Sequence, residues 1–224
     1  MAATRAKEAA ELLPQCDDAA PAVPGAWTVK DHLAHMAAWR EHAAHLLAPG
    51  GRAEAMAEGR NLEERNAAIH EATRGLSAAA VAESVRTSWE VLAAAIEACS
   101  EEDLRAPRPN DPERQVWEVI PGNTHGHLAE HLEYLASGRG DESAAEAVAL
   151  WVHDLDNQSF ADDRTRGSAD YNLGCFYARR GRVEDAFPYL RRGLELNPGL
   201  REWAREDRDL DPIRRAAMVA ALLG

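Results

Sequence analysis

The sequence lacks the features that mark membrane-spanning, secreted and nucleic-acid-binding proteins. In its 224 residues no apolar run reaches the roughly 18 residues of a membrane helix, and the first residues contain no apolar core of a secretory signal. Aspartate and glutamate number 38 against 25 lysine and arginine residues, so the net charge is −13 and there is no basic excess for binding phosphate backbones. We therefore expect a cytoplasmic protein that binds neither a membrane nor nucleic acid directly.

Cysteines and runs of β-branched residues are also scarce. The three cysteines, Cys16, Cys99 and Cys175, are widely spaced and form no CxxC pair, so we expect reduced, buried thiols. The chain is instead rich in Ala, Leu, Glu and Arg, which are strong helix formers. This composition predicts an all-α protein.

Apolar periodicity and chain breakers predict a helical bundle in residues 1–138. Thr28 and Asp31, three residues apart, are typical of a capping box at the start of the second helix. The longer helices, connected with one crossover loop, are expected to form a four-helix bundle. The expected helices cover residues 2–16, 28–47, 61–73, 78–99 and 123–137.

The connections and the first helix carry more specific expectations. The first helix is expected to place Ala9, Leu12 and Leu13 on its apolar face. Residues 51–60 are poorly patterned, which indicates a loop or a short, loose helix. Residues 105–114 contain three prolines and an Asn-Asp pair, which predicts an extended connection.

Two histidines lie four residues apart on the last bundle helix. At that spacing His127 and His131 sit one above the other. Neutral imidazole nitrogens suit zinc, nickel and related divalent metals, so the pair can hold a metal ion. The alternative is that both side chains only form hydrogen bonds on a solvent or core face of the helix. A third ligand elsewhere would favour the metal.

A resemblance supplies that third ligand. The segment Trp27–Trp39, WTVKDHLAHMAAW, resembles the second-helix signature of the DinB/YfiT-like superfamily of four-helix bundles. The segments 61–66 and 122–131 resemble, more narrowly, its ClbS/DfsB-type branch. In metal-binding members one histidine on the second helix joins the pair on the last helix. Carried over by position, the resemblance implies that His35, His127 and His131 are the metal ligands. Three protein ligands leave a fourth coordination position open, which is the arrangement of a catalytic metal site.

Other side chains near these helices are further candidates. His32, His42, His45 and His125 leave the choice of the second-helix ligand open. Glu64 and Asn123 are candidates for a polar catalytic group, although a solvated helix face also explains Glu64. Three tryptophans either line a flat apolar pocket or belong to the bundle core: Trp27, Trp39 and Trp89.

Residues 139–224 form a second expected domain, again helical. The segment 169–198 resembles a tetratricopeptide repeat, with small Gly174 and Ala178 where two helices approach, Gly181 at the turn and Pro198 at the end. Such repeats need about three units to bury a continuous core. The helices expected at residues 143–156 and 200–223 should therefore cap the single unit.

Three functions remain open at this point. The first is a metal-dependent enzyme, containing zinc or nickel, that acts on a small electrophilic molecule by hydrolysis or by transfer of a low-molecular-weight thiol. The resemblance implies a role in detoxification or self-resistance for such an enzyme, and it is compatible with a homodimer. The second is a metal-free, ClbS-like cyclopropane hydrolase or sequestering protein. The third is an interaction protein that binds a protein partner through its repeat-like tail.

Overall fold

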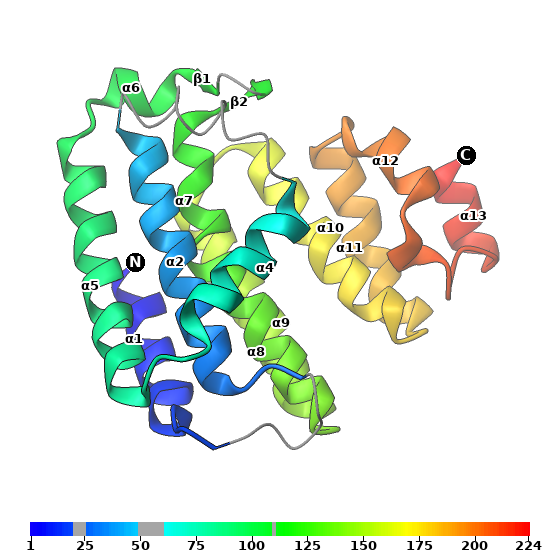
Figure 1. Cartoon of the computed structure of the whole chain (residues 1–224). Helices are drawn as coiled ribbons and strands as arrows, with labels where there is room; N and C mark the ends of the chain where they lie inside the picture. Colours follow the sequence, from blue (N-terminus) through cyan, green and yellow to red (C-terminus); the bar gives the residue numbers. More distant parts are fainter. Residues whose placement is uncertain (20–25, 49–60, 109–110) are drawn as a thin grey trace. The chain divides into compact units, whose positions relative to one another are not determined.

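The computed structural model describes residues 1–19, 26–48, 61–108 and 111–224, and it confirms the all-α prediction. The loop expected at residues 51–60 lies outside the described residues. The helices, labelled in Figure 1 where there is room, are α1 (Ala2–Glu11), α2 (Val29–Leu47), α4 (Leu62–Thr73), α5 (Ala78–Ala98), α6 (Glu101–Arg105), α7 (Val119–Gly122), α8 (His125–Gly138), α9 (Glu142–Ser159), α10 (Asp163–Arg179), α11 (Val183–Leu196), α12 (Leu200–Glu206) and α13 (Ala217–Leu223).

The connection that was expected to be extended contains a small hairpin. Strands β1 (Pro107–Arg108) and β2 (Asp111–Gln115) pair antiparallel, with Pro107 opposite Gln115. A 3₁₀ turn, Val116–Glu118, then leads into α7. Further 3₁₀ turns cover Leu13–Gln15 and Arg208–Leu210.

The described residues group into two compact units, 1–131 and 132–224. Helix α8 crosses the division, since it begins at His125 and ends at Gly138. The domain boundary expected at residue 138 stays a prediction.

Helix α2 runs through the middle of the first unit and contacts α4, α5 and α7 (Figure 1). Thr28 and Asp31 form the predicted capping box: the Thr28 hydroxyl accepts from the Asp31 amide at 3.1 Å, and the Asp31 carboxylate accepts from the Thr28 amide at 2.8 Å. Residues 32–37 are all buried. Because six consecutive helical residues point in every direction around the axis, this stretch of α2 is surrounded on all sides.

The expected apolar face of the first helix was right for Leu12, which is buried, and wrong for Ala9. Ala9 is exposed, and the buried stripe of α1 consists of Thr4 and Glu8, followed by Leu12 just beyond the helix. The helix also ends at Glu11 instead of reaching Cys16, because Pro14 follows in a 3₁₀ turn. A polar residue therefore lies where an apolar one was expected.

Arg40 of α2 explains the burial of Glu8. Its Nη1 lies 2.8 Å from Glu8 Oε1, and both side chains are 1% exposed. Arg40 Nε donates to Ser88 Oγ at 3.0 Å, and Trp89 Nε1 donates to Glu8 Oε2 at 2.6 Å. The guanidinium also lies over the Trp89 ring, 4.4 Å from its centroid. This cluster, Glu8, Arg40, Ser88 and Trp89, joins α1, α2 and α5 through a paired charge.

The second unit is built around the close pair α10 and α11. A Cβ at Gly174 would lie 2.7 Å from the Leu190 side chain, which confirms that a small residue is needed there. Gly181 has φ +69° and makes the turn between the two helices. The pair is covered by its neighbours, since α9 contacts α10 while α13 contacts α11 and α12. The core shared by these helices includes Ala145, Phe176, Leu190, Leu194, Ala204 and Ile213.

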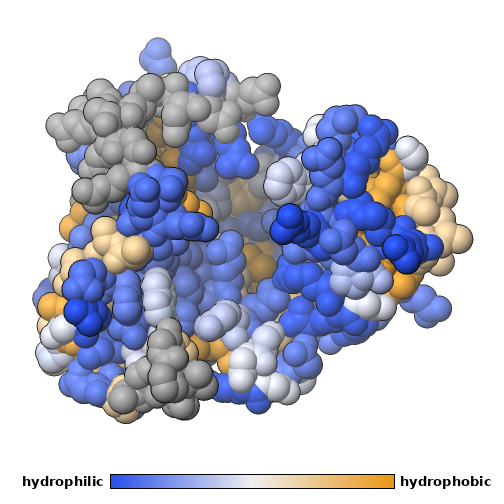
Figure 2. Space-filling model, turned by 45° about the vertical axis from the view of Figure 1, so that its right-hand side comes forward, coloured by the Kyte–Doolittle hydropathy of each residue, from blue (hydrophilic) through white to orange (hydrophobic). Residues whose placement is uncertain are grey.

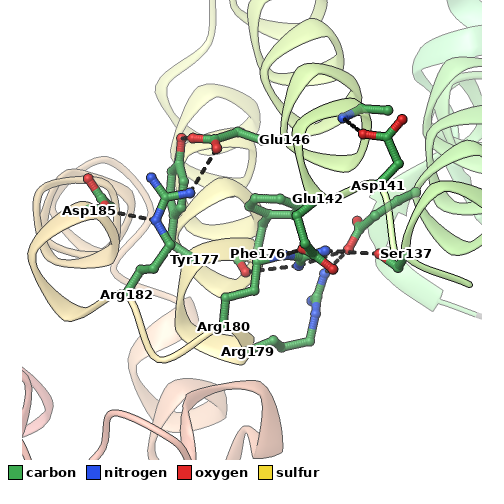
Figure 3. A network of polar contacts seen from close by, with 12 residues as sticks. Ser137, Asp141, Glu142, Glu146, Phe176, Tyr177, Arg179, Arg180, Arg182 and Asp185 are labelled. Carbon is green, nitrogen blue, oxygen red and sulfur yellow. Dashed lines mark hydrogen bonds and ion pairs between the residues drawn. The ribbon is translucent and has the colours of Figure 1, made fainter. Parts of the chain in front are cut away.

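Arginines around the α10–α11 turn tie it to α8 and α9 (Figure 3). Arg180 donates to Glu142 at 2.7 Å and to Ser137 at 3.0 Å, and it lies 3.7 Å from the Phe176 ring centroid. Arg182 Nη1 donates to Glu146 Oε2 at 2.8 Å. Arg182 also lies over an aromatic ring, 4.6 Å from the Tyr177 centroid, so in both arginines the planar group covers a ring while its edge binds carboxylates.

The visible surface is mostly hydrophilic, with apolar residues in small patches (Figure 2). Within the described residues no helix combines the length and the apolar character that crossing a bilayer requires.

The Arg40 cluster yields a stability prediction. Glu8→Leu strands a buried guanidinium, so we expect the free energy of unfolding to fall by about 3–5 kcal/mol. Removing both charges in Glu8→Leu/Arg40→Met should cost less than Glu8→Leu alone, because no unpaired charge remains. Urea titration followed by circular dichroism measures both variants. Lys7→Ala breaks the nearby Lys7–Glu11 pair and serves as the control, with an expected cost of about 0.5 kcal/mol. Equal losses for Glu8→Leu and Lys7→Ala would contradict the assignment.

The helix pair of the second unit yields another prediction. A Cβ at Gly193 would lie 2.8 Å from the Tyr171 amide nitrogen and 2.9 Å from the Gly167 carbonyl oxygen. These backbone atoms cannot yield without moving α10, so Gly193→Ala should destabilise the protein by about 1–3 kcal/mol. Gly138→Ala is the matched control, since a Cβ there meets nothing within 4 Å. Urea midpoints that agree for the two variants would refute the close approach.

Candidate metal centre

Three histidines from two helices meet inside the first unit. The Nε2 atom of His127 lies 3.1 Å from Nε2 of His35 and 3.1 Å from Nε2 of His131. Ligand nitrogens of the three side chains all lie within 4.8 Å of one another. Among the described residues, no other group of three histidine, cysteine or carboxylate side chains comes this close together.

Helix geometry explains why these rings meet. His127 and His131 are one turn apart on α8, so their rings lie side by side on one face, tilted by 44° with their centroids 4.7 Å apart. His35 faces them from the buried middle of α2, where its side chain is 4% exposed. The capping box at Thr28 fixes where α2 begins and therefore which residues of α2 face α8.

The nitrogen spacing fits a metal site. With Zn–N bonds of 2.0–2.1 Å, two ligands of a tetrahedral zinc ion lie about 3.3 Å apart. Two of the three nitrogen pairs, His35–His127 and His127–His131, have separations of 3.1 Å, close to that value. The outer Nδ1 atoms of His35 and His127 are buried and have no hydrogen-bond partner among the described residues. Three imidazole nitrogens suit zinc, nickel or copper better than magnesium or calcium, which prefer oxygen ligands.

Two tryptophans flank the histidines. The Trp27 ring lies 5.0 Å from the His35 ring and 5.4 Å from the His32 ring, measured between centroids. Trp39 lies 6.3 Å from His35, and its Nε1 donates to Asn66 of α4 at 3.0 Å. These large rings remove water from the imidazoles on two sides.

Burial keeps the histidines uncharged. It lowers the pKa of His35 to about 4, of His127 to about 3 and of His131 to about 2, because the charged form loses its hydration. Positive charge on neighbouring rings lowers each pKa further, and Arg40 adds to this effect at His127. At neutral pH each ring therefore presents a lone pair, the form that binds a metal.

The structure places the remaining candidate residues as follows. Trp27 and Trp39 lie against the histidines, whereas Trp89 belongs to the Arg40 cluster. Glu64 is exposed in the first turn of α4. The Asn123 side-chain amide donates to the Val119 carbonyl at 2.8 Å, so it supports the α7–α8 junction.

The other histidines take separate places. His42 contacts Arg65 and the Trp39 ring, His45 is exposed, and His125 lies 3.4 Å from the Thr124 hydroxyl. His32, in contrast, touches the triad: its Nδ1 lies 2.8 Å from Nδ1 of His131. Its position one turn before His35 was a usable signal for this contact.

Sequence reasoning missed His70. This α4 residue stacks on Trp27 with the ring centroids 5.1 Å apart and the planes within 9°. Its Nε2 lies 3.9 Å from an Asp31 oxygen. No spacing rule links α4 to the start of α2, so the sequence contains no signal for this contact.

Comparison with known proteins identifies one family. A family model described as the DinB superfamily matches residues 2–135. No curated protein and no solved structure matches the chain.

The low pKa values predict how pH affects the metal-free protein. In the unfolded chain these histidines titrate near 6.5, whereas the folded pKa values lie at about 4 or below. The unfolded state binds more protons between these values, so stability that is present above pH 6.5 is lost as the pH falls toward 4. We expect the urea midpoint of chelator-treated protein to drop between about pH 7 and about pH 5.

One substitution separates the contribution of His127 to the pH dependence of stability from the contribution of the carboxylates. His127→Gln cannot take up a proton, so its urea midpoint should depend less steeply on pH than the parent's. His45→Ala, on the same helix as His35 but exposed, should retain the parent's dependence. A steepness that is unchanged in His127→Gln would show that His127 is not held uncharged.

Proposed function

Since the chain belongs to the DinB superfamily, we propose that it is a metal-dependent enzyme that acts on a small electrophilic molecule, with His35, His127 and His131 as the metal ligands. The observation that supports this most is the set of three uncharged imidazole nitrogens within 4.8 Å of one another. Three protein ligands leave a fourth position free, as in catalytic rather than structural zinc sites.

His35, His127 and His131 would hold a divalent metal, which would supply Lewis-acid chemistry and the activation of water or a thiol as a nucleophile. The chain's own residues supply the environment. Trp27 and Trp39 each pack against His35 and exclude water from the histidine cluster. Both rings present flat apolar surfaces to a substrate. Arg40 adds positive charge near His127, and its pairing with Glu8 keeps that charge compensated within the unit.

A second candidate is the metal-free, ClbS-like hydrolase or sequestering protein. The observation in its favour is that the imidazoles contact one another at hydrogen-bonding distance, 2.8–3.1 Å, so the cluster is also consistent without a metal. Both candidates fit detoxification of a reactive metabolite, and both take an electrophilic small molecule as substrate. Metal dependence separates them.

For residues 139–224 we propose a single tetratricopeptide-like unit capped by its own flanking helices. The close approach at Gly174, the turn at Gly181 and the coverage of α10 and α11 by α9 and α13 support this proposal. Helices that cover the pair favour capping over a longer array of repeats. A protein partner for this tail and a homodimer stay predictions.

Elemental analysis of protein purified without a histidine tag tests the metal. We expect about one equivalent of zinc or nickel in the parent, and its loss in the His127→Ala/His131→Ala variant because two of three ligands are gone. His45→Ala removes an exposed histidine of α2 and should retain the metal. A parent that stays metal-free after reloading with zinc, nickel and manganese would overturn the proposal.

Turnover then separates the two candidates. Metal-loaded protein should open small epoxide or cyclopropane electrophiles, with or without an added low-molecular-weight thiol, and a chelator should abolish the reaction. Hydrolysis that survives complete metal removal would instead establish the metal-free enzyme. Loss of the electrophile without product, in a ratio of one per protein, would indicate sequestration.

A further inference from the structure

His32 contacts the histidine cluster at Nδ1 of His131, the nitrogen of that ring that is not a proposed metal ligand. Its Nδ1 lies 2.8 Å from Nδ1 of His131, and the two ring centroids are 4.7 Å apart. His131 faces His127 through its other nitrogen, Nε2, at 3.1 Å. The His32 side chain is buried, at 4% exposure, so water does not compete freely for this contact.

The chemistry of imidazole fixes which atom carries the proton. A neutral imidazole has one N–H and one lone pair, on different nitrogens. When Nε2 of His131 gives its lone pair to a metal, Nδ1 must carry the proton and can only donate. Its partner at 2.8 Å, Nδ1 of His32, must then accept, so His32 carries its own proton on Nε2.

We propose that His32 is a positioning residue that accepts a hydrogen bond from Nδ1–H of His131 and thereby holds His131 in the tautomer and ring orientation that bind the metal. This inference rests on the proposed metal site. Hydrogen bonds to the outer nitrogen of a ligating histidine orient the ring and raise its basicity, and their loss typically weakens metal binding 10- to 100-fold.

The geometry distinguishes this role from that of a fourth ligand. His32 approaches His131 at its Nδ1 atom, whereas His127 approaches it at the other ring nitrogen, Nε2, which is the proposed metal ligand. Trp27 packs against both His32 and His35, with centroid distances of 5.4 and 5.0 Å, and so restricts the His32 ring.

The three ligands are also unequal. The buried Nδ1 atoms of His35 and His127 have no hydrogen-bond partner among the described residues. His131 is therefore the ligand whose outer nitrogen has a side chain placed to receive its proton. We expect His32 to affect the metal through His131 and not through the other two rings.

Two substitutions of nearly equal shape test the acceptor. In His32→Asn the amide Oδ1 takes the place of the imidazole Nδ1, two bonds from Cβ, and can accept the proton from His131. In His32→Leu the side chain also branches at Cγ but has no acceptor. Zinc affinity, measured by competition with a chromophoric chelator, should fall about 10- to 100-fold in His32→Leu and stay close to the parent in His32→Asn.

A spectroscopic measurement reports the tautomers directly. In zinc-loaded, ¹⁵N-labelled parent protein, long-range ¹H–¹⁵N correlation spectra should show the proton of His131 on Nδ1 and that of His32 on Nε2. In His32→Leu the Nδ1–H signal of His131 should shift upfield, because its hydrogen bond is lost. His45→Leu, on the same helix, should leave that signal unchanged.

The outcomes separate this inference from the metal proposal. A parent without zinc affinity overturns the metal site itself. If the parent binds zinc and folded His32→Leu binds it equally well, the metal site stands and the role of His32 is refuted. Circular dichroism establishes that each variant is folded. Equal loss of affinity in folded His32→Asn and His32→Leu would likewise refute hydrogen-bond acceptance.

Discussion

The first unit depends on keeping four imidazoles out of water without charging them. Burial lowers the pKa of His32, His35, His127 and His131 to about 4 or below, so the rings stay neutral and can approach one another within 3.1 Å or less. Charged rings at these distances would repel one another strongly in a medium of low dielectric constant. The same desolvation that prevents protonation therefore makes a compact nitrogen cluster feasible.

Helix α2 also contains a buried polar group that stays charged and is neutralised by a partner. Arg40, five residues after His35, is buried and charged, and Glu8 neutralises it from another helix at 2.8 Å. A buried guanidinium without a carboxylate would cost several kcal/mol, and it would also act on His127, whose pKa it lowers. Helix α2 thus carries two buried polar clusters, one neutral and one compensated, and both fix its neighbours through specific polar contacts rather than apolar packing alone.

The sequence contained enough information for the helices, the cap of α2 and the three histidines that the structure brings together. Helical spacing placed His127 above His131, and the resemblance added His35. The buried face of α1 was not predictable, because the buried Glu8 carboxylate is held by Arg40 and Trp89, which follow 32 and 81 residues later in the chain. The stack of His70 on Trp27 was unpredictable for the same reason: the two residues come from separate elements, and no local periodicity relates them.

The short interval between Thr28 and His35 has a consequence for how this protein can vary. Each α-helical residue advances the chain by 1.5 Å and rotates it by about 100°. One inserted or deleted residue between the cap and His35 would turn both α2 imidazoles away from α8, and a whole-turn change would shift them by about 5.4 Å along the axis. Length changes between Thr28 and His35 would therefore separate the two halves of the nitrogen cluster.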